Sequence, residues 1–337
     1  MRPGPRSPFT VAIAQVAPVF LDRDATVAKA CDLVAEAGRS GARLVAFPEA
    51  FVPAYPDWVW AVPSGQGDVL AALYGELVAN AVDVPSDATD RLCRAAREAG
   101  IHVVMGINER NTEASGGSLY NTLLYIDAEG RLLGKHRKLV PTGGERLVWA
   151  QGDGSTLAAY ETDLGVIGGL ICWENYMPLA RYAMYAWGTQ IYVAATWDRG
   201  EPWLSTLRHI AKEGRCYVLG SCMPLRLADF PDRFAALKER FYAGAGEWIN
   251  VGDSAIVDPE GRVVAGPMHK EEGLLYAEID PALLAGPKWM LDVAGHYGRP
   301  DVFRLTVDRR PRPVVSVEDE EVRPRLVEAG VEGVPAE

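Results

Sequence analysis

Residues 166–178 read VIGGLICWENYMP, an apolar run followed by a cysteine, polar residues and a proline. An uninterrupted apolar run of this kind is typical of a strand buried on both faces of a sheet. Proline is favoured in the first turn of a helix, so Pro178 predicts a helix over residues 178–186. The segment therefore predicts a buried strand that ends beside Cys172 and leads into a helix, which is a unit of an α/β fold.

The same alternation of apolar strands and amphipathic helices extends along the chain in both directions. Further strands are expected at 9–16, 43–47, 101–108, 119–126, 131–139, 190–195, 216–221, 254–257 and 274–279. Further helices are expected at 26–37, 68–82, 87–99 and 203–214. The turn sequences DAEG at 127–130 and DPEG at 258–261, each followed by arginine, indicate two similar halves. We therefore expect an α/β fold in which two sheets pack face to face with helices outside, a four-layer αββα sandwich.

Composition excludes several classes of protein. The chain has 337 residues, 48% of them hydrophobic and 23% charged, which fits an ordinary globular protein. Its net charge of -11 argues against a nucleic-acid partner, because binders of phosphate display a basic face. No apolar run approaches the roughly 18 residues that cross a bilayer, so we expect no membrane partner. Residues 1–16 lack the apolar core of a signal peptide, and the expected location is cytoplasmic.

The five cysteines are the next feature to interpret. They are scattered and odd in number, so they predict free thiols and no disulfide framework. Cys31, Cys93, Cys216 and Cys222 lie in apolar or helical runs and resemble small core residues. Cys172 differs, because a thiol at a strand–helix bend faces the positive end of the helix, and we expect a lowered pKa. A simple core role for Cys172 stays open. No CxxC pair, HExxH motif or histidine cluster is present, so no metal site is expected.

Two further segments carry residues suited to catalysis. The sequence VAFPE, residues 45–49, delivers Glu49 at the end of a buried strand, where α/β folds often place their sites. Apolar neighbours predict a raised pKa for Glu49, which suits a general base. The sequence KHRKLVPTGGE, residues 135–145, places Lys138 on the strand face opposite Arg137, where it could stabilise developing negative charge. Taken alone, each segment also fits a solvated glutamate or a basic edge strand.

Together, a glutamate after FP, a lysine after HR and a cysteine after an apolar strand resemble the nitrilase superfamily of carbon–nitrogen hydrolases. The resemblance runs from about residue 9 to about residue 305 and implies the αββα sandwich with two pseudo-symmetric halves. It implies that Glu49 is the general base, Lys138 the catalytic lysine and Cys172 the nucleophile. It further implies that Glu145 is the second glutamate, which holds the lysine and the reacting water.

The segments around these residues are similar to the true nitrilase branch. They are CWEN at 172–175, the stretch 138–149, QGDGS at 151–155 and GHYGRPD at 295–301, where the family usually has serine in place of Gly298. The resemblance implies hydrolysis of an organic nitrile, an arylacetonitrile or an aliphatic nitrile, to carboxylic acid and ammonia, without metal or organic cofactor. An amidase or carbamoylase and a cyanide dihydratase with the same triad remain alternatives, as do an inert scaffold and a thiol sensor.

Aromatic residues supply candidates for the substrate pocket. Tyr55, Trp173 and Trp197 are expected to bind substrate, whereas Trp58 and Trp60 are interpreted as core or interface residues. Residues 9–280 are expected to form the catalytic domain, and residues 281–337 a C-terminal extension and tail at assembly interfaces. The resemblance implies a homodimer, formed through the helices after the cysteine, that builds larger spiral oligomers or filaments.

Overall fold

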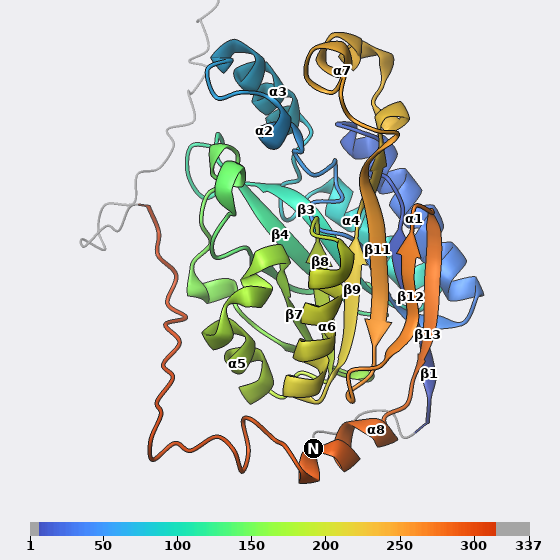
Figure 1. The fold of residues 1–337 in the computed structure, drawn as a ribbon, viewed down its shortest axis with the longest axis vertical. Helices are drawn as coiled ribbons and strands as arrows, with labels where there is room; N and C mark the ends of the chain where they lie inside the picture. The colour runs from blue at the N-terminus through green and yellow to red at the C-terminus, as the bar shows by residue number, and fades with distance from the viewer. Residues whose placement is uncertain (1–6, 315–337) are drawn as a thin grey trace, which may run out of the picture.

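The computed structural model describes residues 7–314, so residues 315–337 of the expected tail lie outside the described part. Two sheets lie face to face with helices on their outer faces (Figure 1). In the described residues, the first sheet has the strand order β13-β1-β2-β3-β4-β5. The second has the order β10-β11-β9-β8-β7-β6, with β12 paired to β11. The predicted four-layer αββα sandwich is therefore confirmed.

The bounds of the elements follow the predicted alternation. The first sheet contains β1 (Phe9–Gln15), β2 (Ala42–Ala46), β3 (His102–Arg110), β4 (Leu119–Ile126), β5 (Leu132–Arg137) and β13 (Gly273–Ile279). The second contains β6 (Tyr160–Thr162), β7 (Gly165–Ile171), β8 (Ile191–Thr196), β9 (Tyr217–Cys222), β10 (Pro224–Arg226), β11 (Trp248–Val257) and β12 (Val263–His269). The helices are α1 (Arg23–Arg39), α2 (Trp58–Ala61), α3 (Gly67–Ala79), α4 (Asp87–Ala99), α5 (Pro178–Ala186), α6 (Gly200–Gly214), α7 (Ala235–Phe241) and α8 (Ala282–Ala285).

The two halves share one topology. Strands β1, β2 and β3 run parallel to one another, as do β7, β8 and β9. Each parallel set continues into antiparallel strands, β4 and β5 in the first sheet and β11 and β12 in the second. This repeated arrangement is the pseudo-symmetry that the two turn sequences indicated.

Alternating side chains on the strands build three apolar layers. On β1, Val11 and Ile13 face the second sheet, while Ala12 and Ala14 join the layer beneath α1 and α4. Leu170 of β7 joins the third layer, beneath α5 and α6. Figure 1 shows α5 and α6 over one outer face of the sandwich and α1 behind the other. Within residues 7–314, no helix combines the length and apolar character that a bilayer-spanning segment needs.

This stacking brings together the ends of strands from both sheets. Glu49 follows β2 of the first sheet, while Cys172 follows β7 of the second. Trp197 follows β8, the parallel neighbour of β7. Because parallel strands end at the same edge of a sheet, Cys172 and Trp197 lie at one edge of the second sheet, and Glu49 reaches the same place from the first.

Candidate active site

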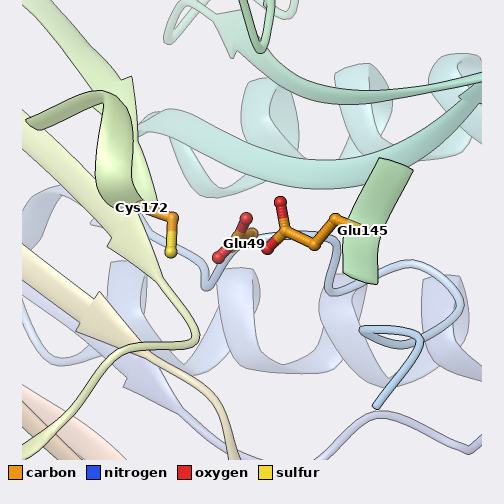
Figure 2. Close-up of side chains that lie close together, drawn as sticks. All are labelled: Glu49, Glu145 and Cys172. Carbon is orange, nitrogen blue, oxygen red and sulfur yellow. The ribbon is translucent and has the colours of Figure 1, made fainter. Parts of the chain in front are cut away.

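Four side chains that the sequence singled out meet at this end of the sandwich. One side-chain atom each of Glu49, Glu145 and Cys172 lies within 4.8 Å of the other two, and Figure 2 shows the three side chains facing one another. The Lys138 ammonium bridges the carboxylates, with Nζ 2.9 Å from Glu49 Oε1 and 2.6 Å from Glu145 Oε2. All four residues are buried. The fold thus joins a thiol, a lysine and two carboxylates in one buried cluster.

Glu49 is held from several sides. The Asn121 amide donates to its Oε1 at 2.6 Å, and the Trp197 backbone N–H donates to its Oε2 at 2.7 Å. The loop that carries Glu49 passes close to β3 at Gly106. A Cβ at this position would lie 2.0 Å from the carbonyl oxygen of Pro48, so glycine is needed to leave room for the loop. Burial raises the pKa of Glu49 to about 7, although Lys138 opposes this. The raised pKa expected from the sequence is therefore confirmed, and it suits a base working near neutrality.

Cys172 lies at a sharp bend directly after β7. Its φ of 53° is in the left-handed region, which non-glycine residues adopt rarely. Asn175 fixes the bend by donating to the carbonyl oxygens of Leu170 and Cys172, at 3.1 and 2.8 Å. The bend places the thiol beside the Glu49 carboxylate, with Glu145 on the far side of Glu49 (Figure 2).

The expectation of a lowered pKa for Cys172 is wrong. Burial raises the pKa of the thiol well above its usual value and the charge of Glu49 adds to this, while Lys138 offsets only part. A 3-10 turn, Cys172–Tyr176, also separates the thiol from α5, which begins at Pro178. The thiol therefore keeps its proton until a base removes it.

Lys138 and Glu145 come from one segment that the sheet turns inward. Lys138 follows β5, where Lys135 and Arg137 on the other face both bind Glu109. Burial lowers the pKa of Lys138, but the negative charges around it, that of Glu49 first, outweigh burial, so the net pKa is raised and the ammonium stays charged. Glu145 lies in a 3-10 turn, Gly143–Leu147, where its Oε2 also accepts from the Thr142 N–H at 2.7 Å.

A buried glutamate outside the cluster, Glu174, connects the segment that carries Cys172 with the segment that carries Lys138. Glu174 accepts from the backbone N–H of Ile171 at 2.8 Å and from that of Leu139 at 2.5 Å. These donors are the neighbours of Cys172 and Lys138. His136 Nε2 lies 3.0 Å from the same carboxylate. Glu174 therefore fixes the spacing between the segments that carry the thiol and the ammonium.

The aromatic candidates separate into two groups. Tyr55 and Trp197 stack with ring centroids 4.5 Å apart and planes 4° apart, beside the carboxylates. Trp173 is 53% exposed, and its indole donates to Asp198 at 2.9 Å. Trp58 is buried against Phe20, as expected of a core residue. The structure thus brings two of the three expected pocket residues to the cluster, and Trp173 to its outer side.

The carboxylates that could hold a metal ion in this cluster are already engaged by a lysine. In residues 7–314, Glu49, Glu145 and Cys172 are close enough for their donor atoms to share an ion. The Lys138 ammonium, however, already binds both carboxylates. The charge that a cation would supply is therefore provided by the chain itself.

The carbon-nitrogen hydrolase family model matches residues 10–286, which include all four residues of the cluster. The chain belongs to the carbon–nitrogen hydrolase family. Among curated proteins, it is 43% identical over 314 residues to "Aliphatic nitrilase" of Sinorhizobium fredii, covering 91% of this chain and 98% of that protein. It is 40% identical over 316 residues to "Nitrilase 1" of Arabidopsis thaliana, covering 93% and 90%. These relatives place this carbon–nitrogen hydrolase in the nitrilase branch.

Solved structures support the fold. Nit3 of Saccharomyces cerevisiae, described as a member of branch 10 of the nitrilase superfamily, matches with a TM-score of 0.67. Its sequence is 21% identical, and the match covers 86% of this chain and 97% of that one. An amidase from Nesterenkonia sp. matches with a TM-score of 0.60 at 20% identity, covering 86% and 97%. At this identity the likeness concerns the arrangement of helices and strands alone.

Sequence reasoning missed several residues of the site of this carbon–nitrogen hydrolase. Asn121 lies inside an apolar strand, where a lone amide was the one available signal. The role of Trp197 in holding Glu49 belongs to its backbone N–H and leaves no trace in residue type. Glu174 could have been noticed as an acidic residue two positions after the cysteine, in a segment that predicts burial. Trp149, whose ring lies 5.7 Å from Lys138 Nζ, had no signal beyond its aromatic character.

Proposed function

We propose that this nitrilase-branch enzyme hydrolyses an organic nitrile to a carboxylic acid and ammonia, with Cys172 as nucleophile. The observation that supports this most directly is the buried cluster in which a thiol faces two carboxylates bridged by one ammonium. A nitrile carbon is electrophilic but has no good leaving group. The site must therefore add a nucleophile and supply protons to nitrogen, which this cluster is equipped to do.

In the proposed mechanism, Glu49 takes the Cys172 proton and the sulfur attacks the nitrile carbon, giving a thioimidate. Water adds, and Lys138 stabilises the charged tetrahedral species. Ammonia leaves and a thioester remains, which a second water, activated by Glu49, converts to the acid. Glu145 holds Lys138 in place and orients the reacting water. The raised pKa of Glu49 fits this sequence, because burial makes its carboxylate a stronger base for the buried thiol proton of Cys172.

The substrate is proposed to be an apolar nitrile, either an arylacetonitrile or an aliphatic nitrile. The stacked rings of Tyr55 and Trp197 would give the pocket an apolar wall beside the carboxylates. Trp173, next to the nucleophile, would contribute from the exposed side. The relative from Sinorhizobium fredii bears the name aliphatic nitrilase, which supports the aliphatic choice.

A substrate panel tests the proposed function. The purified enzyme is given phenylacetonitrile, an aliphatic dinitrile, cyanide and phenylacetamide, and ammonia, acid and amide are measured separately. We expect acid and ammonia from at least one organic nitrile at a higher kcat/KM than from the amide. Activity confined to the amide would make the enzyme an amidase or carbamoylase, and activity confined to cyanide would make it a cyanide dihydratase.

The pH dependence of kcat/KM should reflect the ionisation of Glu49. Because burial raises the pKa of Glu49 to about 7 and the base must be deprotonated, kcat/KM should rise with pH through about 7. Asn121→Leu removes a hydrogen bond to the charged carboxylate, so the acid limb should move up by about one pH unit. Thr122→Val, which removes a hydroxyl bound to Glu109 instead, should leave the limb in place. An unmoved limb in Asn121→Leu would exclude Glu49 as the titrating base.

We further propose the catalytic role for residues 9–280 and an assembly role for the extension that begins at residue 281. Large exposed side chains in the extension support this, namely Trp289, Met290, Tyr297 and Phe303. A homodimer through α5 and α6 that extends into spiral filaments is expected, and light scattering with negative-stain microscopy would test it. The five cysteines are free thiols, which supports a cytoplasmic location.

A further inference from the structure

A directed chain of hydrogen bonds leads from the protein surface to Glu145. Trp60, which is 51% exposed, donates its indole N–H to the Tyr55 hydroxyl at 3.1 Å. Tyr55 donates in turn to Glu145 Oε1 at 2.7 Å. An indole N–H only donates and a phenol has a single proton, so the direction of the chain is fixed. The Tyr55 oxygen accepts from Trp60, and its proton is given to Glu145.

The same tryptophan packs on the backbone that carries Glu145. A Cβ on Gly143 would lie 2.9 Å from the Trp60 ring, and one on Gly144 would lie 3.0 Å from the carbonyl oxygen of Val59. Gly143 also has a φ of +49°, which favours glycine. The two glycines therefore make room for α2 to lie against the turn directly before Glu145. Trp60 contacts the turn through its ring and reaches the carboxylate through Tyr55.

Tyr55 is itself held firmly. Its ring stacks on Trp197, whose backbone N–H donates to the other carboxylate, Glu49. Burial, followed by the charge of Glu145, raises the pKa of Tyr55 well above its usual value, so the phenol keeps the proton that it donates. Tyr55 is therefore a fixed hydrogen-bond donor between the two carboxylates, in addition to any role as a wall of the pocket.

We propose that Trp60 and Tyr55 are positioning residues that hold Glu145 and thereby direct the reaction to acid rather than amide. This proposal rests on the proposed nitrile hydrolysis. The tetrahedral species carries sulfur, hydroxyl and amino groups on one carbon. On the acid route the nitrogen takes a proton from Lys138, the hydroxyl gives its proton to Glu49, and the C–N bond breaks with its electron pair on nitrogen, so that ammonia and a thioester result. On the amide route the C–S bond breaks with its pair on sulfur, and the thiolate regains a proton from Glu49.

The contacts of Glu145 predict which of the two routes becomes slower when the hydrogen bonds from Trp60 through Tyr55 are removed. Its Oε2 accepts from Lys138 and from the Thr142 N–H, while its Oε1 accepts from Tyr55. Without the phenol proton, the negative charge of Glu145 is balanced more by Lys138, and the ammonium is drawn away from the departing nitrogen. Nitrogen is then protonated less readily, so a larger share of the intermediate should leave as amide.

A double-mutant cycle tests the proposal. Tyr55→Phe keeps the stacked ring and removes the hydroxyl, and Trp60→Phe keeps an aromatic ring and removes the N–H. With phenylacetonitrile or the best nitrile of the panel, we expect the amide-to-acid ratio to rise about tenfold in Tyr55→Phe and about threefold in Trp60→Phe. The double variant should match Tyr55→Phe, because Trp60 acts through the hydroxyl that is already absent. Trp248→Phe, which alters a half-buried tryptophan near Arg226, should leave the ratio unchanged.

Total nitrile consumption separates this proposal from the one on which it rests. If the wild type consumes nitrile but neither single variant changes the ratio, the positioning role is refuted. If the changes in the amide-to-acid ratio add up in the double variant, Trp60 does not act through Tyr55, and the proposed hydrogen-bond chain is refuted. If the wild type consumes no nitrile, the proposed function itself fails. A merely structural role would lower the yield of folded enzyme without producing a non-additive change in the product ratio.

Discussion

Replacement of Cys172 by alanine is expected to lower kcat by a factor on the order of 10⁴ to 10⁶, the loss seen when a covalent nucleophile is removed. The fold should persist, because alanine fits the space and the backbone at φ 53° holds a non-glycine residue in both proteins. Ammonia release from the best nitrile of the panel measures the loss. Mass spectrometry of the wild type during turnover should show a substrate adduct on the Cys172 peptide and none in the variant.

A second buried thiol provides the matched control. Cys216 is fully buried beneath α5 and α6, as Cys172 is buried at the cluster, and both have a pKa raised by burial. Cys216→Ala should therefore lose some stability through its cavity while keeping nitrile turnover. Retained activity in Cys172→Ala, or an adduct on Cys216, would remove the nucleophile from the proposed mechanism.

The fold was predictable because apolar periodicity and turn residues agree along most of the chain. The helix expected at 178–186 begins at Pro178 as expected, and β7 ends at Ile171. Elements with a weak pattern were missed. β12 contains Gly266-Pro267 and is largely exposed, so neither alternation nor a β-branched run marks it clearly. The short helix α7 lies in a charged segment whose amphipathic pattern spans only seven residues.

The site was predictable only as far as its residues carry motifs. Glu49, Lys138, Glu145 and Cys172 were found because their neighbouring residues resemble a family pattern, and the structure brings them together. The electrostatics of Cys172 were predicted with the wrong sign, because local sequence indicates a nearby helix but not the burial around the sulfur. Burial of the sulfur depends on two sheets that are far apart in the chain and lie face to face. The same distance explains why the bond between Asn121 and Glu49 left no signal.

Replacement of Lys138 by methionine should have the second large effect, on both activity and stability. Lys138 binds Glu49 and Glu145 with its side chain fully buried, so its loss leaves two carboxylates close together without a cation. Removing one partner of a buried ion pair costs about 3–5 kcal/mol of unfolding free energy. The loss of stabilisation of the tetrahedral species should also lower kcat by about 10³-fold. Urea denaturation and nitrile turnover measure the two effects.

The stability loss in Lys138→Met should depend on pH in a direction that the charges determine. In the wild type, burial raises the pKa of Glu49 to about 7, although the charge of Lys138 lowers it. The pKa of a glutamate in an unfolded chain is about 4.3. Removing the ammonium should raise the pKa of Glu49 in the folded state further. A group with a raised pKa in the folded state stabilises the fold fully below its unfolded pKa, and that contribution disappears as pH rises through the folded value. The stability difference between variant and wild type should therefore be smaller at pH 5 than at pH 8.

Lys135→Met, which removes a partly exposed lysine from Glu109 while Arg137 stays bound, should show neither the large loss nor this trend. A difference that is equal at both pH values would mean that the carboxylates of the cluster do not depend on Lys138 for their charge.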